Sequence, residues 1–183
     1  PIGEKVIVHA SNFRKVKRVC DVAKIFAELR PQVDCKLLMV GDGPERPKCE
    51  EYLNHAGLEH EVRFFGKQEQ MEEVLVISDL FLLPSEYESF GLAALEAMAA
   101  HVPVLSSNAG GLPEVNIDGQ TGFIFNVGDI ATATQRGIEL LGNDELLDRF
   151  KEQAYQHALE FDISKIVPKY ESIYARFCRM DCE

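Results

Sequence analysis

The chain has 183 residues, of which 46% are hydrophobic, and this is enough for one domain with a substantial core. Its formal net charge of −11 argues against broad binding to nucleic acids or anionic membranes. No apolar run approaches the roughly 18 residues of a membrane-spanning helix, and the first residues form no signal peptide. We therefore expect a cytoplasmic protein.

The expected elements alternate between short apolar runs and helical patterns, which is typical of βαβ units and a parallel sheet. The expected strands are Val6–Ala10, Cys35–Val40, Val62–Gly66, Leu80–Pro84, Val102–Ser106 and Gly122–Phe125. The helices between them should cover about 17–30, 44–56, 69–78, 89–100 and 112–117. After Gly128 the pattern is wholly helical, at about 129–142, 144–160 and 164–180.

This order predicts an α/β fold, a Rossmann-like doubly wound parallel sheet followed by an all-helical C-terminal segment. No linker, low-complexity segment or internal repeat interrupts the chain. We expect residues 1–183 to form a single domain, with the sheet in about 1–128 and the C-terminal helices in about 129–183. Such sheets bind ligands at the carboxyl ends of their strands, where the chemically informative motifs of this chain also fall.

The stretch from Glu88 to Glu96 is the most informative motif. Ser89 is a natural N-cap for the helix that follows, and glycine in the first turn allows a ligand to approach closely. The first turn would present an anion site made of the free amides of Phe90, Gly91 and Leu92. The two carboxylates would lie roughly 12 Å apart along the helix, too far for the ~5–9.5 Å of a glycosidase pair. The spacing suits a long ligand with hydroxyl groups at both ends and phosphates between them, such as a nucleotide sugar.

A basic cluster follows the first expected strand in this otherwise acidic chain and consists of Arg14, Lys15, Lys17 and Arg18. Because the cluster and the amides after Ser89 should face the same cleft, we expect it to bind a diphosphate. The residues around Glu96 are apolar, and a carboxylate in such surroundings needs partners, which two ribose hydroxyl groups would supply.

Glu88-x7-Glu96 resembles the E-x7-E motif of the retaining family-4 glycosyltransferases of the GT-B fold, the glycosyl transferases group 1. Four segments stand in the order of that family: His9–Arg18, Leu38–Pro44, Glu96–Ala99 and Gly110–Glu114. The octapeptide from Ser11 to Arg18 is most similar to that of the bacillithiol-pathway N-acetylglucosaminyl L-malate synthases.

The resemblance implies that the chain is the donor-binding, C-terminal half of a retaining glycosyltransferase. The donor would be a UDP-sugar, with UDP-N-acetylglucosamine the first choice and L-malate a possible acceptor. The acceptor site would lie on an N-terminal domain that this chain lacks, so the chain alone should be inactive. Retention in this family is described as attack on the same face with help from the departing diphosphate, which implies no protein nucleophile, no cofactor and no metal.

The resemblance also assigns roles to individual residues. Glu88 would contact the donor sugar, Glu96 the ribose, and Lys17 the diphosphate. The family usually has an arginine where this chain has Asn12, so Arg14 is the expected substitute. Guanidinium and ammonium groups there would stabilise the charge on the departing diphosphate.

Several loop residues complete the expected site. Gly41 should line the nucleotide pocket, with a packing role favoured over direct binding. The backbone at Lys67 and Gln68 would read the base. Gly110 and Gly111 would lie near the sugar or the phosphate, although they could also form only a flexible turn.

His101 stands where the family usually ends the helix with glycine, and we expect a strained cap rather than a catalytic group. The cysteines are scattered, and only Cys178 and Cys182 could share a helical face. Reduced thiols and no metal site are therefore expected. Two other functions remain open: a stand-alone nucleotide-sugar binding or regulatory module, and half of a GT-B-fold UDP-sugar epimerase. The epimerase would need catalytic carboxylates and a histidine that the sequence does not place.

Overall fold

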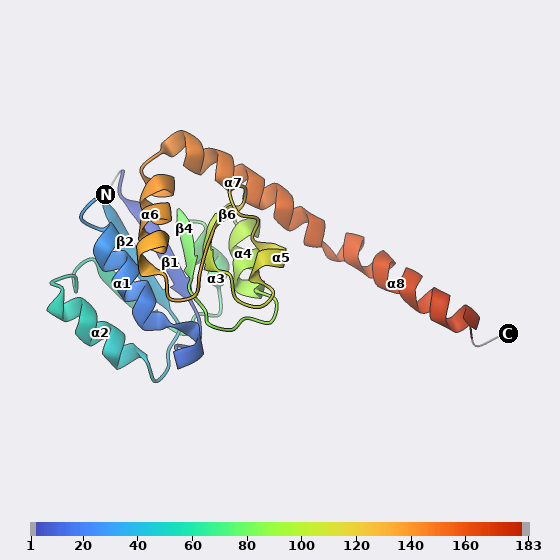
Figure 1. Ribbon diagram of the computed structural model, residues 1–183, viewed down its shortest axis with the longest axis horizontal. Helices are drawn as coiled ribbons and strands as arrows, with labels where there is room; N and C mark the ends of the chain where they lie inside the picture. Colours follow the sequence, from blue (N-terminus) through green and yellow to red (C-terminus); the bar gives the residue numbers. More distant parts are fainter. Residues whose placement is uncertain (1–2, 181–183) are drawn as a thin grey trace.

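The computed structural model describes residues 3–180, and a parallel sheet lies at its centre (Figure 1). The strands are β1 (Lys5–Ala10), β2 (Cys35–Val40), β3 (Val62–Gly66), β4 (Leu80–Leu83), β5 (Val104–Ser107) and β6 (Gly122–Phe125). Their order is β3-β2-β1-β4-β5-β6. The predicted doubly wound Rossmann-like sheet is confirmed. β4 ends before Pro84 and β5 begins after Pro103, because proline has no N–H to donate to a neighbouring strand.

Helices cover both faces of the sheet. They are α1 (Val19–Leu29), α2 (Arg46–His55), α3 (Met71–Leu75), α4 (Leu92–Ala99), α5 (Leu112–Val115), α6 (Ile130–Leu141), α7 (Asp144–Ala158) and α8 (Ile163–Met180). Short 3-10 turns lie at Lys15–Lys17 and Leu159–Phe161. The elements after β6 are helical, as expected.

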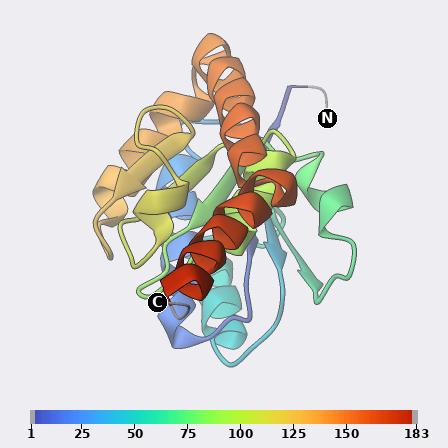
Figure 2. The ribbon, with the colours of Figure 1, turned by 90° about the vertical axis from the view of Figure 1, so that its right-hand side faces the viewer.

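Side chains that alternate along the strands enter two separate cores, so that Ile7 lies in one and Val8 in the other. Helices α1, α2 and α6 cover the first core, and α3, α4 and α5 cover the second. Helix α7 contributes to both, with Phe150 in the first and Ala154 in the second. Figure 2 shows the helices around the sheet from the side where α8 projects.

The direction of winding reverses between β1 and β4, which pair through Ile7 with Leu80 and Val8 with Phe81. From β1 the chain proceeds to β2 and β3 on one side and later to β5 and β6 on the other. The loops after β1 and β4 therefore diverge at their carboxyl ends and leave a crevice, the usual ligand site of such sheets.

At the opposite, amino end of the sheet, charged side chains fasten α7 to the strands. One oxygen of Asp79 accepts a hydrogen bond from the Val6 amide at 2.9 Å, and the other accepts one from Lys151 Nζ at 2.7 Å. Lys5 Nζ pairs with Asp144 at 2.6 Å at the start of α7. These contacts hold the first part of the C-terminal segment against β1 and β4.

His101 has the left-handed conformation that the sequence suggested, with φ of 60°. Its amide donates to Met98 O, and the Val102 amide donates to Ala97 O, which together form a Schellman motif at the end of α4. The imidazole stacks on the Tyr155 ring of α7, with ring centroids 3.9 Å apart. His101 is thus a strained helix cap, as expected, and stacking on Tyr155, which the sequence did not predict, offsets the backbone strain.

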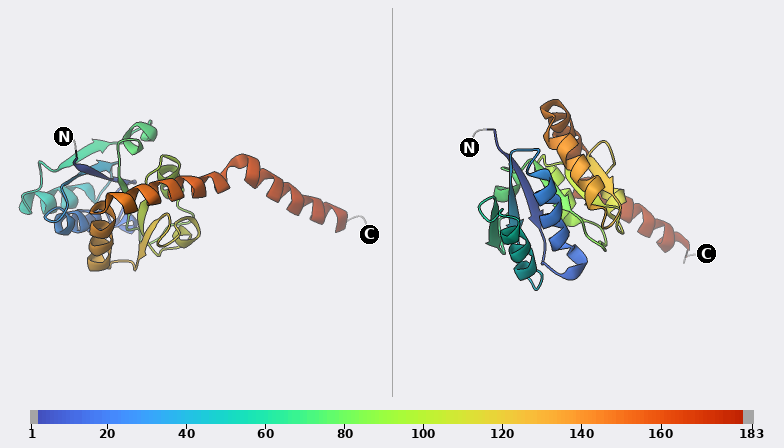
Figure 3. Two further views of the ribbon diagram at one scale, coloured as in Figure 1. Left: turned by 90° about the horizontal axis from the view of Figure 1, so that it is seen from above. Right: turned by 60° about the vertical axis from the view of Figure 1, so that its left-hand side comes forward.

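Helix α8 extends away from the rest of the molecule (Figures 1 and 3). Its large apolar side chains are exposed, including those of Ile163, Val167, Tyr170 and Tyr174. Within residues 3–180, no helix is long and apolar enough to cross a membrane. The side chain of Cys178 and the whole of Cys182 lie outside the described part of the structure, and so does the hypothesis about that pair.

Candidate functional site

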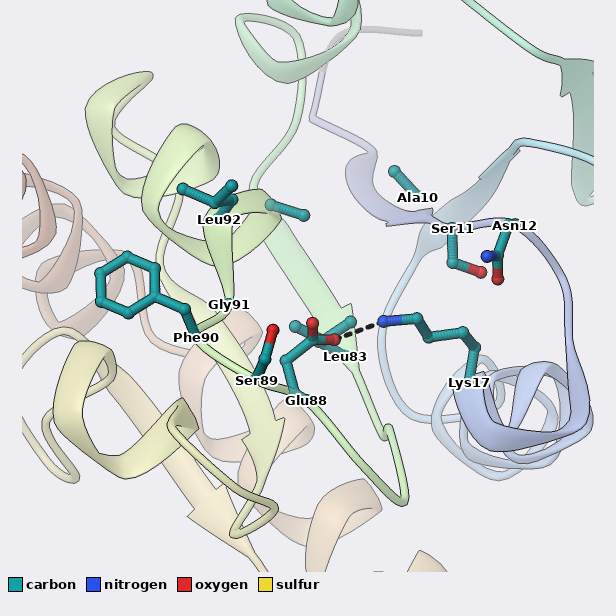
Figure 4. A pocket seen from close by; sticks show the side chains of 11 residues that line it. Ala10, Ser11, Asn12, Lys17, Leu83, Glu88, Ser89, Phe90, Gly91 and Leu92 are labelled. Carbon is teal, nitrogen blue, oxygen red and sulfur yellow. Dashed lines mark hydrogen bonds and ion pairs between the residues drawn. The ribbon is translucent and has the colours of Figure 1, made fainter.

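Two adjoining hollows lie along the carboxyl ends of the strands at the point where the winding reverses. The first has a volume of about 300 Å³ and lies between the loop after β1 and the start of α4 (Figure 4). The second has a volume of about 350 Å³ and lies over the ends of β1, β2 and β3. Both are lined by Ala10, Ser11 and Asn12. The two hollows therefore meet at the end of β1 and form one continuous surface.

Most of the predicted site residues line these hollows. The first contains Lys17, Glu88, Ser89, Phe90, Gly91 and Leu92. The second contains Gly41, Lys67 and Gln68. Four predicted residues line neither hollow: Arg14, Glu96, Gly110 and Gly111. The structure thus brings the expected phosphate and base positions together along one edge of the sheet, and their roles in binding remain predictions.

Lys17 and Glu88 meet directly across the first hollow (Figure 4). Lys17 Nζ donates to Glu88 Oε2 at 2.5 Å, and the Ser85 hydroxyl lies 3.4 Å from the same oxygen. The side chain of Lys17 is 20% exposed and that of Glu88 is 16% exposed. The lysine expected to hold a diphosphate and the carboxylate expected to contact a sugar are therefore each other's partner in this structure.

The rest of the basic cluster is directed elsewhere. Arg14 is exposed and precedes the 3-10 turn that carries Lys17. Arg18 has a left-handed backbone and pairs with the buried Asp21 at 2.5 Å. Lys17 is therefore the member of the cluster whose ammonium group lines the hollow.

The start of α4 differs from the sequence prediction. Ser89 is not the N-cap: the helix begins at Leu92, its N-cap is Gly91, and no side chain caps it. Gly91 has φ of 98°, a conformation that favours glycine, and the turn it makes carries the chain past Ser89 before the helix begins. Within the described residues, the amides of Phe90, Gly91 and Leu92 donate to no backbone acceptor. The predicted trio of free amides is thus present, although the residue that caps the helix is different.

Phe90 contributes its backbone rather than its ring to the hollow. Figure 4 shows the ring turned away from Glu88 and Lys17. It packs edge to face against Phe161, with ring centroids 6.0 Å apart. This contact holds the Phe90 ring away from the ion pair.

Glu96 is exposed, which corrects the premise that apolar surroundings deprive its carboxylate of partners. The residue lies on the outer face of α4, one turn from the end of the helix. There it borders a separate hollow of about 240 Å³, lined otherwise by Met71, Glu72, Leu75, Ala99 and Ala100. Water can solvate the carboxylate here, so burial does not require a ligand. This third hollow shares Met71 with the second, which keeps Glu96 next to the expected nucleotide position.

The glycines after β2 and β5 hold the site loops together by close packing. A Cβ on Gly41 would lie 1.8 Å from Ser11 O, and a Cβ on Gly110 would lie 1.9 Å from Glu88 O. The Gly111 amide donates to Glu88 O at 3.0 Å. Any side chain at Gly41 or Gly110 would therefore displace the loop that carries a predicted ligand contact.

The sequence prediction missed His9, which is fully buried at the end of β1. Its Nδ1 donates to Leu82 O at 2.8 Å, and its Nε2 accepts from the Ser11 hydroxyl at 2.9 Å. The Ser11 hydroxyl in turn accepts from the Phe13 amide at 3.2 Å. Burial lowers the pKa of His9 to about 4, and the nearby charge of Lys17 contributes to the same shift. The neutral imidazole thus joins β1 to β4 and fixes the first residues of the basic loop. A histidine ending an apolar strand two residues before a serine was the available signal.

Relatives of known function match nearly the whole chain. The family described as Glycosyl transferases group 1 matches residues 1–157. N-acetyl-alpha-D-glucosaminyl L-malate synthase of Bacillus anthracis is 46% identical over 180 residues, which make up 98% of this chain and 47% of that protein. D-inositol 3-phosphate glycosyltransferase of Corynebacterium efficiens is 30% identical, covering 100% of this chain and 45% of that protein. The chain spans about half the length of these relatives.

Solved structures of GT-B glycosyltransferases share the fold. A mutant of Staphylococcus aureus TarM, in complex with fondaparinux, alpha-GlcNAc-glycerol and UDP, aligns with a TM-score of 0.87 at 22% identity and covers 94% of this chain and 36% of that one. Anabaena HepE, in complex with UDP and glucose, has the same TM-score and identity and covers 95% of this chain and 49% of that one. Since the family match extends over residues 1–157 and the Bacillus anthracis relative is 46% identical, the chain belongs to the glycosyl transferases group 1 family.

Proposed function

We propose that the chain is the donor-binding half of a retaining glycosyltransferase and that its donor is UDP-N-acetylglucosamine. The observation that carries this proposal is the pairing of Lys17 and Glu88 across a hollow that also contains three free amides. A diphosphate needs cationic and N–H donors, and a sugar needs an acceptor for its hydroxyl groups. The choice of sugar rests on the Bacillus anthracis relative, whose name specifies an N-acetylglucosaminyl group.

In this proposal the nucleotide sugar lies along both hollows. Lys17 and the amides of residues 90–92 bind the diphosphate, with Arg14 moving in from its exposed position. Glu88 accepts hydrogen bonds from the sugar. The base lies over Gly41 and the backbone at Lys67 and Gln68, and the ribose reaches Glu96.

The chemistry assigned to these residues is stabilisation of the leaving group. As the bond to the sugar breaks, negative charge grows on the diphosphate, and preorganised N–H and ammonium donors stabilise it more than they stabilise the ground state. No metal is needed in this proposal, since Lys17, Arg14 and the helix amides supply the positive charge. Acceptor attack on the same face of the sugar requires no nucleophile from this chain.

The acceptor, which we propose to be L-malate, binds to a second domain outside these 183 residues. Two observations support this part of the proposal: the relatives are about twice as long, and α8 carries exposed apolar side chains away from the sheet. A domain in contact with α8 would cover them. The chain by itself is then expected to bind donor without transferring sugar.

Calorimetry with UDP, in buffer containing EDTA and again with Mg²⁺, tests the proposal. We expect the 183-residue chain to bind UDP in both buffers. Absence of binding, or binding only with Mg²⁺, would contradict it. In a parallel assay, UDP release from UDP-N-acetylglucosamine should not respond to L-malate. It should do so once the N-terminal half of a full-length relative is added, and malate-dependent turnover by this chain alone would overturn the half-enzyme proposal.

A further inference from the structure

We infer that Glu88 determines specificity by competing with the ligand's diphosphate for Lys17, so that the site favours an intact nucleotide sugar over a free nucleoside diphosphate. This inference rests on the proposed function. It assigns the carboxylate two successive partners, the lysine in the empty site and the sugar hydroxyl groups in the occupied one.

The first step is the strength of the contact in the empty site. Lys17 Nζ and Glu88 Oε2 are 2.5 Å apart, and both side chains are at least four-fifths buried. Salt and water screen such a pair less than an exposed one. A diphosphate that binds Lys17 must therefore compete with a well-placed carboxylate.

The second step is that the backbone of neither residue can move away easily. The Glu86 amide donates to Val16 O at 2.8 Å, which joins the loop before α4 to the loop that carries Lys17. Behind Glu88, the Gly111 amide holds its carbonyl at 3.0 Å, and Gly110 packs against the same oxygen. A ligand can therefore separate the pair only by turning a side chain, that of Glu88 or that of Lys17.

The third step concerns where the displaced carboxylate goes. Beside a bound diphosphate it faces like charge, and the Ser85 hydroxyl, which lies 3.4 Å from its oxygen in the ion-paired position, is a long and weak donor. A nucleotide sugar offers hydroxyl donors that satisfy the carboxylate, whereas free UDP offers none at that end. The cost of breaking the ion pair is thus offset for the donor and not for the product. The same difference would promote UDP release after transfer.

A double-mutant cycle tests this inference. The Kd for UDP and for UDP-N-acetylglucosamine is measured for the wild type, Glu88→Gln, Lys17→Gln and the double variant. Glu88→Gln should lower the Kd for UDP about two- to fivefold, the range expected for loss of a competing ion pair. It should leave UDP-N-acetylglucosamine unchanged or weaker. In the Lys17→Gln background the gain for UDP should disappear.

Glu86→Gln is the matched control, because it removes the same charge two residues earlier from a side chain that is 58% exposed. It should change the Kd for both ligands by the same factor. Weaker or unchanged UDP binding in Glu88→Gln would overturn the inference while leaving the proposed function intact. So would equal tightening of both ligands, or a gain for UDP that persists without Lys17. Failure of the wild type to bind either ligand would instead overturn the proposed function, and this inference with it.

Discussion

Two lysine–carboxylate pairs, one at each end of the sheet, are nearly alike in geometry and differ in surroundings. Lys151 and Asp79 are 2.7 Å apart at the amino end, with side chains 28% and 19% exposed. Lys17 and Glu88 are 2.5 Å apart at the carboxyl end, with side chains 20% and 16% exposed. Distance and burial therefore do not distinguish a structural pair from one at a ligand site.

The difference lies in what else each pair touches. Asp79 also accepts the Val6 amide, so both of its oxygens are used within the protein, and the pair joins β1, β4 and α7. Glu88 uses one oxygen, and the pair lies over a hollow beside free amides. An ion pair whose carboxylate oxygens both have partners within the protein supports the fold. An ion pair that borders a hollow and unpaired N–H donors can exchange partners with a ligand.

The largest expected effect comes from removing one lysine from each pair. Lys17→Ala should weaken the binding of UDP and of pyrophosphate alike, by about tenfold to a hundredfold. The reason is the loss of a charge-assisted contact of roughly 1.5–3 kcal/mol. Lys151→Ala should lower the stability by about 1 kcal/mol and leave UDP affinity unchanged. Calorimetry and thermal unfolding of both variants provide the measurements. Loss of UDP affinity in Lys151→Ala without unfolding would show that the two pairs do not have separate roles.

The pH dependence of stability should come from the carboxyl end of the sheet. His9 has a folded pKa of about 4, below its usual value of 6.5. Between these values the unfolded chain binds a proton that the folded chain does not, so stability falls as the pH falls, beginning near 6.5. The loss should reach about 2 kcal/mol by pH 5, before most carboxylates titrate.

Urea unfolding at several pH values between 7 and 5 measures this loss. His9→Gln should show a much smaller slope over that range, and Lys151→Ala should retain the wild-type slope. A flat wild-type profile, or an equal slope in His9→Gln, would contradict the assignment to His9.

The smallest expected effect is at Glu96, whose carboxylate is exposed. Glu96→Ala should weaken UDP by about fivefold and leave pyrophosphate unchanged, since its proposed partner is the ribose and an exposed contact contributes roughly 1 kcal/mol. Glu72 borders the same hollow, so Glu72→Ala serves as the control. Equal losses for UDP and pyrophosphate would place Glu96 away from the ribose.

The strands and the position of the site could be read from the sequence because both depend on local patterns. Apolar runs of four to six residues between turn residues identified each strand, and the motifs that follow the first and fourth strands proved to face each other through Lys17 and Glu88. The left-handed cap at His101 could also be predicted, since the family resemblance places a helix-ending glycine at this position.

Other features depend on contacts between segments far apart in the sequence. Ser89 has the chemistry of an N-cap, yet the turn at Gly91 moves the N-cap of α4 two residues onward. Glu96 is surrounded by apolar residues in the sequence, but only Ala97 and Met98 beside it enter the core, and its own carboxylate lies in water. The apolar character of adjacent residues in a helix therefore does not predict whether a side chain is buried.

The sequence alone determined the α/β class, the family and the residue types that we propose to face a nucleotide sugar, because these follow from hydrophobic periodicity and from motifs of a few residues. Only the tertiary structure decided which of these residues meet. Each of three contacts joins segments more than 20 residues apart in the sequence. They are the ion pair between Lys17 and Glu88, the hydrogen bond of the buried His9 to Leu82, and the packing of Gly110 against Glu88. Such contacts form when the sheet brings the ends of its strands together, and local sequence patterns cannot predict them.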